Sequence, residues 1–292
     1  MTRCETRPTR SPWLSRLLAG LTLAGLCLAG PTATAGPWVK APGEGYLKAG
    51  ATWFEAEEGF NQGISTGLAY TGITYNIYGE VGLPGDLQLV ADVPLVLATN
   101  RSGAGVKYHN STFGDARFEL DYALLPDLPL TLGLEAKIPL YTPLAEGTAL
   151  RPYPRSTEKF PDAGDGNVDL TPKLLFGYSF HPIPAWATAE LGYRARFDGF
   201  ADGLHWAVGG GIFAVPDYVA LGVYASGVVN IQEDEDPAAQ QTKEFSYGQV
   251  YLLGKGLPFD PDLGLTLSVG RILHARNSSL GTDVSLGLSH GF

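Results

Sequence analysis

The strongest constraint on the fold of this chain is an alternation of apolar and polar side chains that recurs from residue 46 to the end. In the last stretch, residues 281–292, Val284 and Leu286 share one parity, whereas Asp283 and Ser285 share the other. Alternate side chains of a β-strand point to opposite faces, so this stretch predicts a strand with one apolar face and one small or polar face. No helical period occurs between such stretches that could cover the apolar faces. The pattern therefore predicts an all-β chain.

Segments of this kind are separated by turn signals rich in Pro, Gly and Asp. They lie near residues 46–56, 66–82, 87–99, 114–125, 130–140, 168–180, 186–197, 204–214, 218–230, 244–255, 263–274 and 281–292. The segment 244–255 has no clear parity, so its two faces cannot be assigned. The count is about twelve, and an even number predicts that both termini lie on the periplasmic side, as in single-chain bacterial barrels.

The apolar parity indicates contact with lipid. A soluble sheet with one wet face is the alternative, but charge is consistently absent from this parity, where it would cost about 2–4 kcal/mol at mid-bilayer. The expected turns on one side are short, whereas the opposite connections 100–113, 143–167 and 231–243 are longer. An open edge in lipid leaves backbone groups unpaired, so the last strand should close against the first. We therefore predict a transmembrane, antiparallel, up-and-down β-barrel of about twelve strands over residues 36–292.

Aromatic residues mark one rim of the predicted barrel. Phe180, Trp186, Tyr218 and Phe292 lie beside the short turns, where an aromatic girdle is expected. The terminal Phe292 is further expected to act as an assembly signal for the barrel-assembly machinery.

Two features are less regular. Pro94, Pro139 and Pro172 lie inside expected strands, and because proline cannot donate to the ladder, bulges or early strand ends are expected there. Residues 36–45, which are rich in Gly and Pro, are expected to form a short periplasmic lead-in.

Residues 1–35 have the organisation of a cleaved secretory signal peptide. The basic region carries Arg3, Arg7, Arg10 and Arg16, the apolar region reads LLAGLTLAGLCLAG, and Ala33-Thr34-Ala35 is a cleavage motif. A retained membrane helix is the alternative, but the apolar run is short and ends at Pro31. Export by this signal predicts delivery through the periplasm to the bacterial outer membrane.

Cleavage would also change the composition. Both cysteines, Cys4 and Cys27, lie within residues 1–35, so the mature chain would contain neither disulfides nor thiolates. The segment holds four Arg and one Glu, so its removal moves the formal net charge from −10 to −13. An acidic chain of this kind lacks the basic footprint that nucleic acid binding requires.

The charged residues of the polar parity are the best candidates for a functional site. If the apolar face points outward, they surround the lumen, which gives the set Asp115, Arg117, Glu119, Asp121, Glu135, Lys137, Asp169, Lys173, Glu190, Arg194 and Arg196. Their signs are mixed across neighbouring strands, which favours a salt-bridged lumen that holds the barrel in shape. Selection of a permeant solute is the alternative interpretation.

No enzyme, cofactor or metal motif stands out. Residues 63–67 fit G-x-S-x-G, but they lie in a loop before a strand and not in a strand-turn-helix. No histidine is followed by the serine pattern of outer-membrane phospholipases. The acidic residues around Asn167 lack the Gly and distal Glu of a calcium loop, and the run 233–236 is expected to keep a loop in water.

Several short motifs occur in a familiar order. A strand enters the turn Gly85-Asp86, the next strand carries Pro94, and later strands follow Gly114-Asp115 and Gly164-Asp165-Gly166, with Pro139 between them. In this order, over residues 66–200, the chain resembles a family of outer-membrane β-barrels described as transporter-like or phenol (meta-pathway) degradation proteins. The resemblance implies passage of small, often apolar or aromatic compounds across the outer membrane.

These observations lead to two hypotheses for function. The first is an outer-membrane barrel that acts as a passive channel for small solutes, apolar or aromatic ones among them, with membrane lipid around it and no cofactor. The second is a structural or surface-interaction protein with a plugged lumen.

Overall fold

The fold is seen in a computed structural model, which describes residues 36–292 except 62–63, 66, 126–127, 142–159, 162, 165, 198–199, 217, 233–243, 258–259 and 277–278. The expected signal peptide, the run 233–236 and parts of two predicted loops therefore lie outside the described residues. Within them, every regular element is a β-strand.

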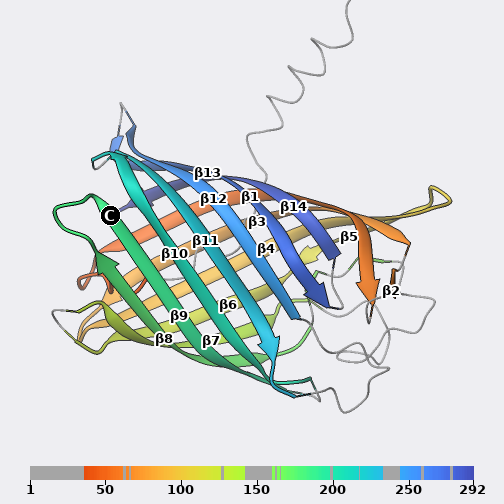
Figure 1. Ribbon diagram of the computed structural model, residues 1–292, viewed down its shortest axis with the longest axis horizontal. Helices are drawn as coiled ribbons and strands as arrows, with labels where there is room; N and C mark the ends of the chain where they lie inside the picture. Colours follow the sequence, from red (N-terminus) through yellow and green to blue (C-terminus); the bar gives the residue numbers. More distant parts are fainter. Residues whose placement is uncertain are drawn as a thin grey trace, which may run out of the picture.

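Twelve long strands form one antiparallel sheet that closes on itself (Figure 1). They are β1 (Gly45–Asn61), β3 (Leu68–Leu83), β4 (Leu87–Ser102), β6 (Asp115–Ala123), β7 (Leu130–Pro139), β8 (Asp169–Ser179), β9 (Ala185–Arg196), β10 (Gly203–Val215), β11 (Val219–Asn230), β12 (Glu244–Leu257), β13 (Asp260–Arg276) and β14 (Ser279–Gly291). Consecutive long strands pair with each other throughout. The prediction of an all-β, up-and-down barrel of about twelve strands is confirmed.

The barrel closes between its first and last strands. β14 pairs with β1 from Tyr46 opposite Gly291 to Trp53 opposite Val284 and beyond. The backbone amide of Gly45 donates to the carbonyl oxygen of Phe292 at 2.7 Å, and the amide of Phe292 donates back to Gly45 at 3.1 Å. The terminal stretch is therefore the closing strand, as its alternation predicts.

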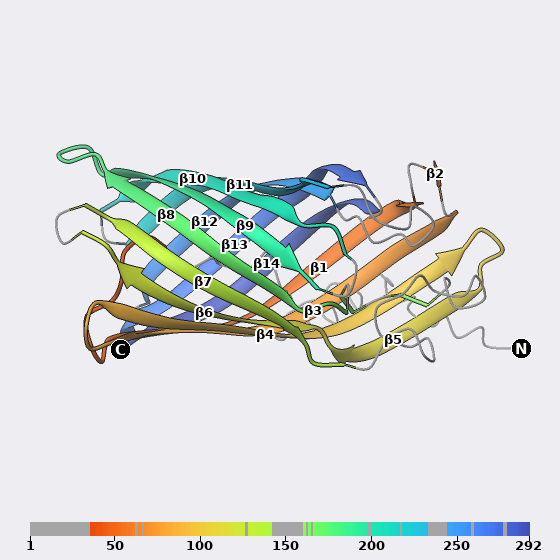
Figure 2. The same ribbon diagram turned by 90° about the horizontal axis from the view of Figure 1, so that it is seen from below.

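One predicted loop contains a strand. Residues 107–113 form β5 (Lys107–Phe113), which pairs with the end of β4 in a hairpin that extends beyond the rim (Figure 2). A second short strand, β2 (Ile64–Ser65), pairs with the end of β1. The prediction of a loop over the whole of 100–113 was wrong. Most side chains of this stretch are polar, so it lacks the apolar face by which the other strands were recognised.

The three prolines lie where the ladders are interrupted. Pro94 is at the point where β4 exchanges its partner β6 for β5, and its carbonyl oxygen accepts from the Gly114 amide at 2.9 Å. Pro139 is the last residue of β7. Pro172 falls in a gap of the β8–β9 ladder between Leu170 and Lys173. The expected bulges and early strand ends are confirmed.

The apolar side chains of the strands are exposed on the outside of the barrel. Leu191 and Val223 are each 59% exposed, although they lie in the middle of β9 and β11. The inward parity is covered instead, and it includes many polar side chains, such as Asp121 and Thr131 at 0%. The usual arrangement of a water-soluble protein is thus inverted.

The connections differ at the two ends. Turns at one end are short, such as Pro84 to Asp86 between β3 and β4, whereas the β4–β5 hairpin extends from the other end (Figure 2). Phe180, Tyr218 and Phe292 are exposed at the short-turn end, as expected for a girdle. Trp186 is not part of it, because its side chain points inward over Gly211. In the described part of the chain, no helix is long and apolar enough to cross a membrane.

Candidate functional site: the barrel lumen

The eleven charged candidates all come from four neighbouring strands, β6 to β9. Asp115, Arg117, Glu119 and Asp121 alternate along β6 and face the inside, opposite the exposed Phe118, Leu120 and Tyr122. The strands β7, β8 and β9 contribute Glu135, Lys137, Asp169, Lys173, Glu190, Arg194 and Arg196 to the same inner surface. We call this surface the charged wall.

Lys173 lies at the centre of the first group of ion pairs in the charged wall. Its Nζ is 2.8 Å from Glu119 Oε2, 3.1 Å from Glu135 Oε2 and 3.2 Å from Glu190 Oε1. The Lys173 side chain is only 1% exposed, so the three carboxylates replace the water around its ammonium group. His205 Nε2 on β10 lies 3.0 Å from Glu190 and extends the group.

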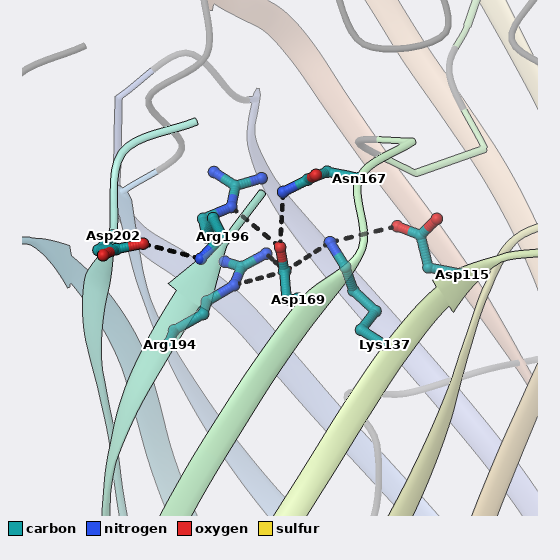
Figure 3. A network of polar contacts seen from close by, with 7 residues as sticks. All are labelled: Asp115, Lys137, Asn167, Asp169, Arg194, Arg196 and Asp202. Carbon is teal, nitrogen blue, oxygen red and sulfur yellow. Dashed lines mark hydrogen bonds and ion pairs between the residues drawn. The ribbon is translucent and has the colours of Figure 1, made fainter. Parts of the chain in front are cut away.

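Asp169 is the centre of the second group (Figure 3). Lys137 Nζ lies 2.7 Å from Asp169 Oδ2, Arg196 Nε donates to Oδ1 at 3.2 Å, and Arg194 Nε donates to Oδ2 at 2.7 Å. Asn167 Nδ2 also donates to Oδ1 of this carboxylate at 2.8 Å. One buried carboxylate is thus surrounded by three cations.

Two further carboxylates lie beside these residues. Lys137 Nζ is also 3.7 Å from Asp115 Oδ2, and the Arg196 backbone amide donates to Asp202 Oδ1 at 2.8 Å (Figure 3). The Lys173 group carries the opposite excess, with three carboxylates around one ammonium group. Charges of both signs are therefore paired within the wall, and such pairs fix side-chain positions across four strands.

The opposite side of the lumen carries tyrosines, hydroxyl groups and an amide from β12, β13, β14 and β1, and the sequence did not predict it. We call this surface the aromatic wall. Tyr247 OH on β12 donates to Asp283 Oδ2 at 3.2 Å, Gln249 Nε2 donates to Ser268 Oγ at 2.6 Å, and the hydroxyls of Thr52 and Ser285 are 2.8 Å apart. The structure assigns the faces of β12, with Tyr247, Gln249 and Tyr251 inward and Val250 and Leu252 outward. Inward tyrosines had obscured the alternation of this strand.

Residues 36–41 lie inside the barrel, so the prediction of a periplasmic lead-in was wrong. Thr131 Oγ1 on β7 donates to the carbonyl oxygen of Pro37 at 2.8 Å, and the Lys40 amide donates to Gln88 Oε1 on β4 at 3.0 Å. Lys40 Nζ is 3.2 Å from Glu80 Oε2. We call residues 36–41 the inner segment. Inside the barrel, the polar side chains of Thr131 on β7 and Gln88 on β4 replace the water to which the backbone of this segment would otherwise bond.

A small residue on β8 makes room for the inner segment. Pro37 and Trp38 pack against Gly177, where an added Cβ would lie 2.5 Å from Pro37 Cγ and 2.8 Å from Trp38 Cζ2. A glycine within a strand was the available sequence signal, because close approach of another segment is one reason for glycine there.

Among the described residues, two cavities border the inner surface of the barrel. The first has a volume of about 420 Å³ and lies between the charged wall and residues such as Phe54, Tyr224 and Tyr247. The second has a volume of about 310 Å³ and lies between the inner segment and the aromatic wall, with Trp38, Trp186 and Tyr251 in its lining. Asn76 and Tyr224 border both cavities, so they mark the boundary between the two.

The remaining sequence candidates lie elsewhere or outside the described residues. Phe292 is 66% exposed at the rim and is tied to Gly45 through the backbone. The residues of G-x-S-x-G and of the acidic loop at 162–169 are described only in part. Asn167 and Asp169 of that loop belong to the ion-pair network, and no group of three potential metal ligands occurs among the described residues.

Comparisons with known proteins identify the fold. No family model matches the chain, and no curated protein matches its sequence. An outer membrane channel from Pseudomonas putida F1, known from a crystal structure, superimposes with a TM-score of 0.64 and 13% sequence identity over 90% of this chain and 100% of that chain.

Two other solved structures are similar at a lower level. The NanC porin has a TM-score of 0.49 and 9% identity, with 84% of this chain and 98% of that chain covered. The translocator domain of the autotransporter NalP from Neisseria meningitidis has a TM-score of 0.49 and 9% identity, with 96% and 95% covered. At these identities the likeness concerns the fold alone, and the superposition on the Pseudomonas putida channel shows that this chain has the fold of an outer-membrane β-barrel channel.

Proposed function

We propose that the protein is a passive channel of the bacterial outer membrane for small solutes, apolar or aromatic ones in particular. The observation that carries this proposal is the lumen itself, which holds a cavity beside the charged wall and a second cavity beside the aromatic side chains, with Asn76 and Tyr224 in both linings. The exposed apolar outer face supports a position in lipid, since this surface would be costly in water.

The orientation and the route to the membrane are part of the proposal. Residues 1–35 direct export and are cleaved, and the barrel-assembly machinery then recognises the last strand with Phe292. The short-turn end, with both ends of the mature chain, faces the periplasm, and the longer connections face outward. This orientation follows the asymmetry of known barrels.

The inner segment favours a second function, a plugged barrel that acts through its outer connections. It is tied to β4 and β7 by two hydrogen bonds and to Glu80 by an ion pair, and it occupies part of the lumen at the short-turn end. The two functions differ in one measurable property, because a plugged barrel passes no solute.

Single-channel conductance and liposome swelling test the channel. The purified mature protein should conduct small ions and admit small solutes, and a variant that lacks residues 36–41 should conduct more. If neither protein conducts or admits any solute, the channel proposal is wrong and the plugged barrel is favoured. Heat-modifiable gel mobility shows that both proteins are folded.

A further inference from the structure

We propose that the second cavity, of about 310 Å³, binds small aromatic carboxylates, with the ring between Trp38, Trp186 and Tyr251 and the carboxylate on the ammonium group of Lys48. This inference rests on the proposed channel function and names the class of solute that the lumen selects.

Lys48 is the group that determines the charge of the solute. It lies on the inward parity of β1, opposite Ser289, and its side chain crosses Gly287, where an added Cβ would be 2.6 Å from Lys48 Cε. Among the residues that the structure describes, no carboxylate lies within 4.0 Å of its Nζ. The Asp92 carboxylate interacts with Lys48 at longer range but already accepts a hydrogen bond from Asn76 Nδ2 at 2.9 Å.

The other lysines of the lumen differ from Lys48 in this respect. Lys40 is 3.2 Å from Glu80, Lys137 is 2.7 Å from Asp169, and Lys173 contacts three glutamates. An ammonium group removed from bulk water without such a partner is costly, and a bound anion would remove that cost. Lys48 is therefore available to a ligand in a way that the paired lysines are not.

The negative charge in the described lining of the second cavity already has partners. Glu190 is the carboxylate that lines it, and Glu190 is held by Lys173 at 3.2 Å and lies 3.0 Å from His205. The charge that remains unpaired at this cavity is positive. A cationic solute would meet Lys48 unfavourably, and a neutral solute would leave it without a partner.

The rest of the lining fits a planar apolar ring. Tyr251 lies over Gly222 and Trp186 over Gly211, since an added Cβ would be 2.2 Å from Tyr251 Cζ and 2.6 Å from Trp186 Cη2. Both rings also line the cavity, as do Trp38 and Leu175. Aromatic rings pair favourably in offset-stacked or edge-to-face arrangements, in addition to the apolar area that they bury. The volume is at the lower end of the range for ligand pockets, about 300–1,000 Å³, which suits a solute of one or two rings.

Equilibrium binding of radiolabelled benzoate and of neutral benzamide to the full-length mature protein in lipid nanodiscs tests this assignment. We expect the wild-type protein to bind benzoate at least about tenfold more tightly than benzamide, because a hydrogen bond between charged groups is stronger than one to a neutral amide. Lys48→Met should remove this preference and leave benzamide binding within about twofold. Lys48→Arg should restore part of it, and Lys107→Met, on the exposed outer hairpin, should bind as wild type.

Two results would overturn the assignment: equal binding of benzoate and benzamide to the wild-type protein, or unchanged benzoate binding by folded Lys48→Met. The first comparison needs no variant, so it stands even if Lys48→Met does not fold. Conductance of potassium chloride, measured on the same preparation, separates this inference from the channel proposal. A conducting protein without benzoate preference refutes only the site, and a benzoate-binding protein that never conducts refutes only the channel.

Discussion

The substitution Lys173→Met gives the sharpest test of the charged wall. It removes the ammonium group from between Glu119, Glu135 and Glu190, whose oxygens lie 2.8, 3.1 and 3.2 Å from Nζ. The methionine keeps most of the volume, so the loss is electrostatic. Removal of one partner from a buried ion pair costs about 3–5 kcal/mol, because the other charge is left buried and uncompensated.

We expect a value near the lower limit, about 3 kcal/mol, since the first cavity also borders Lys173 and water can enter it. The free energy of unfolding is measured by reversible urea titration in lipid vesicles, followed by tryptophan fluorescence. Lys255→Met, at an exposed position of β12, is the matched control and should change stability by less than about 0.5 kcal/mol.

A second variant separates the loss of charge from the loss of packing. If uncompensated carboxylates cause the destabilisation, then Lys173→Met combined with Glu119→Gln and Glu135→Gln should recover much of the stability, because the neutral amides need no cation. A loss below about 1 kcal/mol for Lys173→Met alone, or no recovery in the combined variant, would contradict the view that these pairs hold the wall together.

The remaining predictions concern the ends and the outer face of the barrel. Val223→Lys places a charge on the exposed face in the middle of β11 and should lower the free energy of unfolding in bilayers by about 2–4 kcal/mol, whereas Val223→Leu should have little effect. Deletion of Phe292 should reduce the amount of heat-modifiable protein in the outer membrane, and Phe292→Tyr should not; normal assembly of the deletion variant would contradict the assembly role. Thr131→Val removes the hydrogen bond to Pro37 and should raise channel conductance or its fluctuations, which single-channel recordings detect, if the inner segment limits the lumen.

The fold was predictable from sequence because it depends on a pattern that repeats. Each strand must place uncharged side chains outside, so the same parity recurs and independent segments support one another. The faces of β12 could not be assigned from sequence because Tyr247 and Tyr251 point inward and Val250 and Leu252 outward, so both parities are hydrophobic. Trp186 was misassigned for the same reason, since an aromatic side chain suits either a girdle or a lumen.

The candidate site was predictable only in part. The alternation of side chains predicted that the charged residues of β6 to β9 share one face of the sheet. It did not predict which of them form ion pairs, such as the three cations around Asp169. It also missed Lys48, whose neighbours of the same parity on β1, Tyr46, Gly50, Thr52 and Phe54, are small or aromatic. Nor could it place residues 36–41, because the hydrogen bonds that hold them come from β4 and β7, which are distant in sequence.

The pairing of Tyr46 with Gly291 means that the barrel cannot close until β14 has been synthesised. The partner of the first strand, β14, is made after the other strands of the barrel, so a product of translation that lacks it cannot satisfy its own hydrogen bonds at the seam. Contacts at such a large sequence separation form slowly, and until they form two strand edges stay available to other chains. Truncation anywhere before the final strand should therefore yield a species that requires a chaperone, however many of its hairpins are intact.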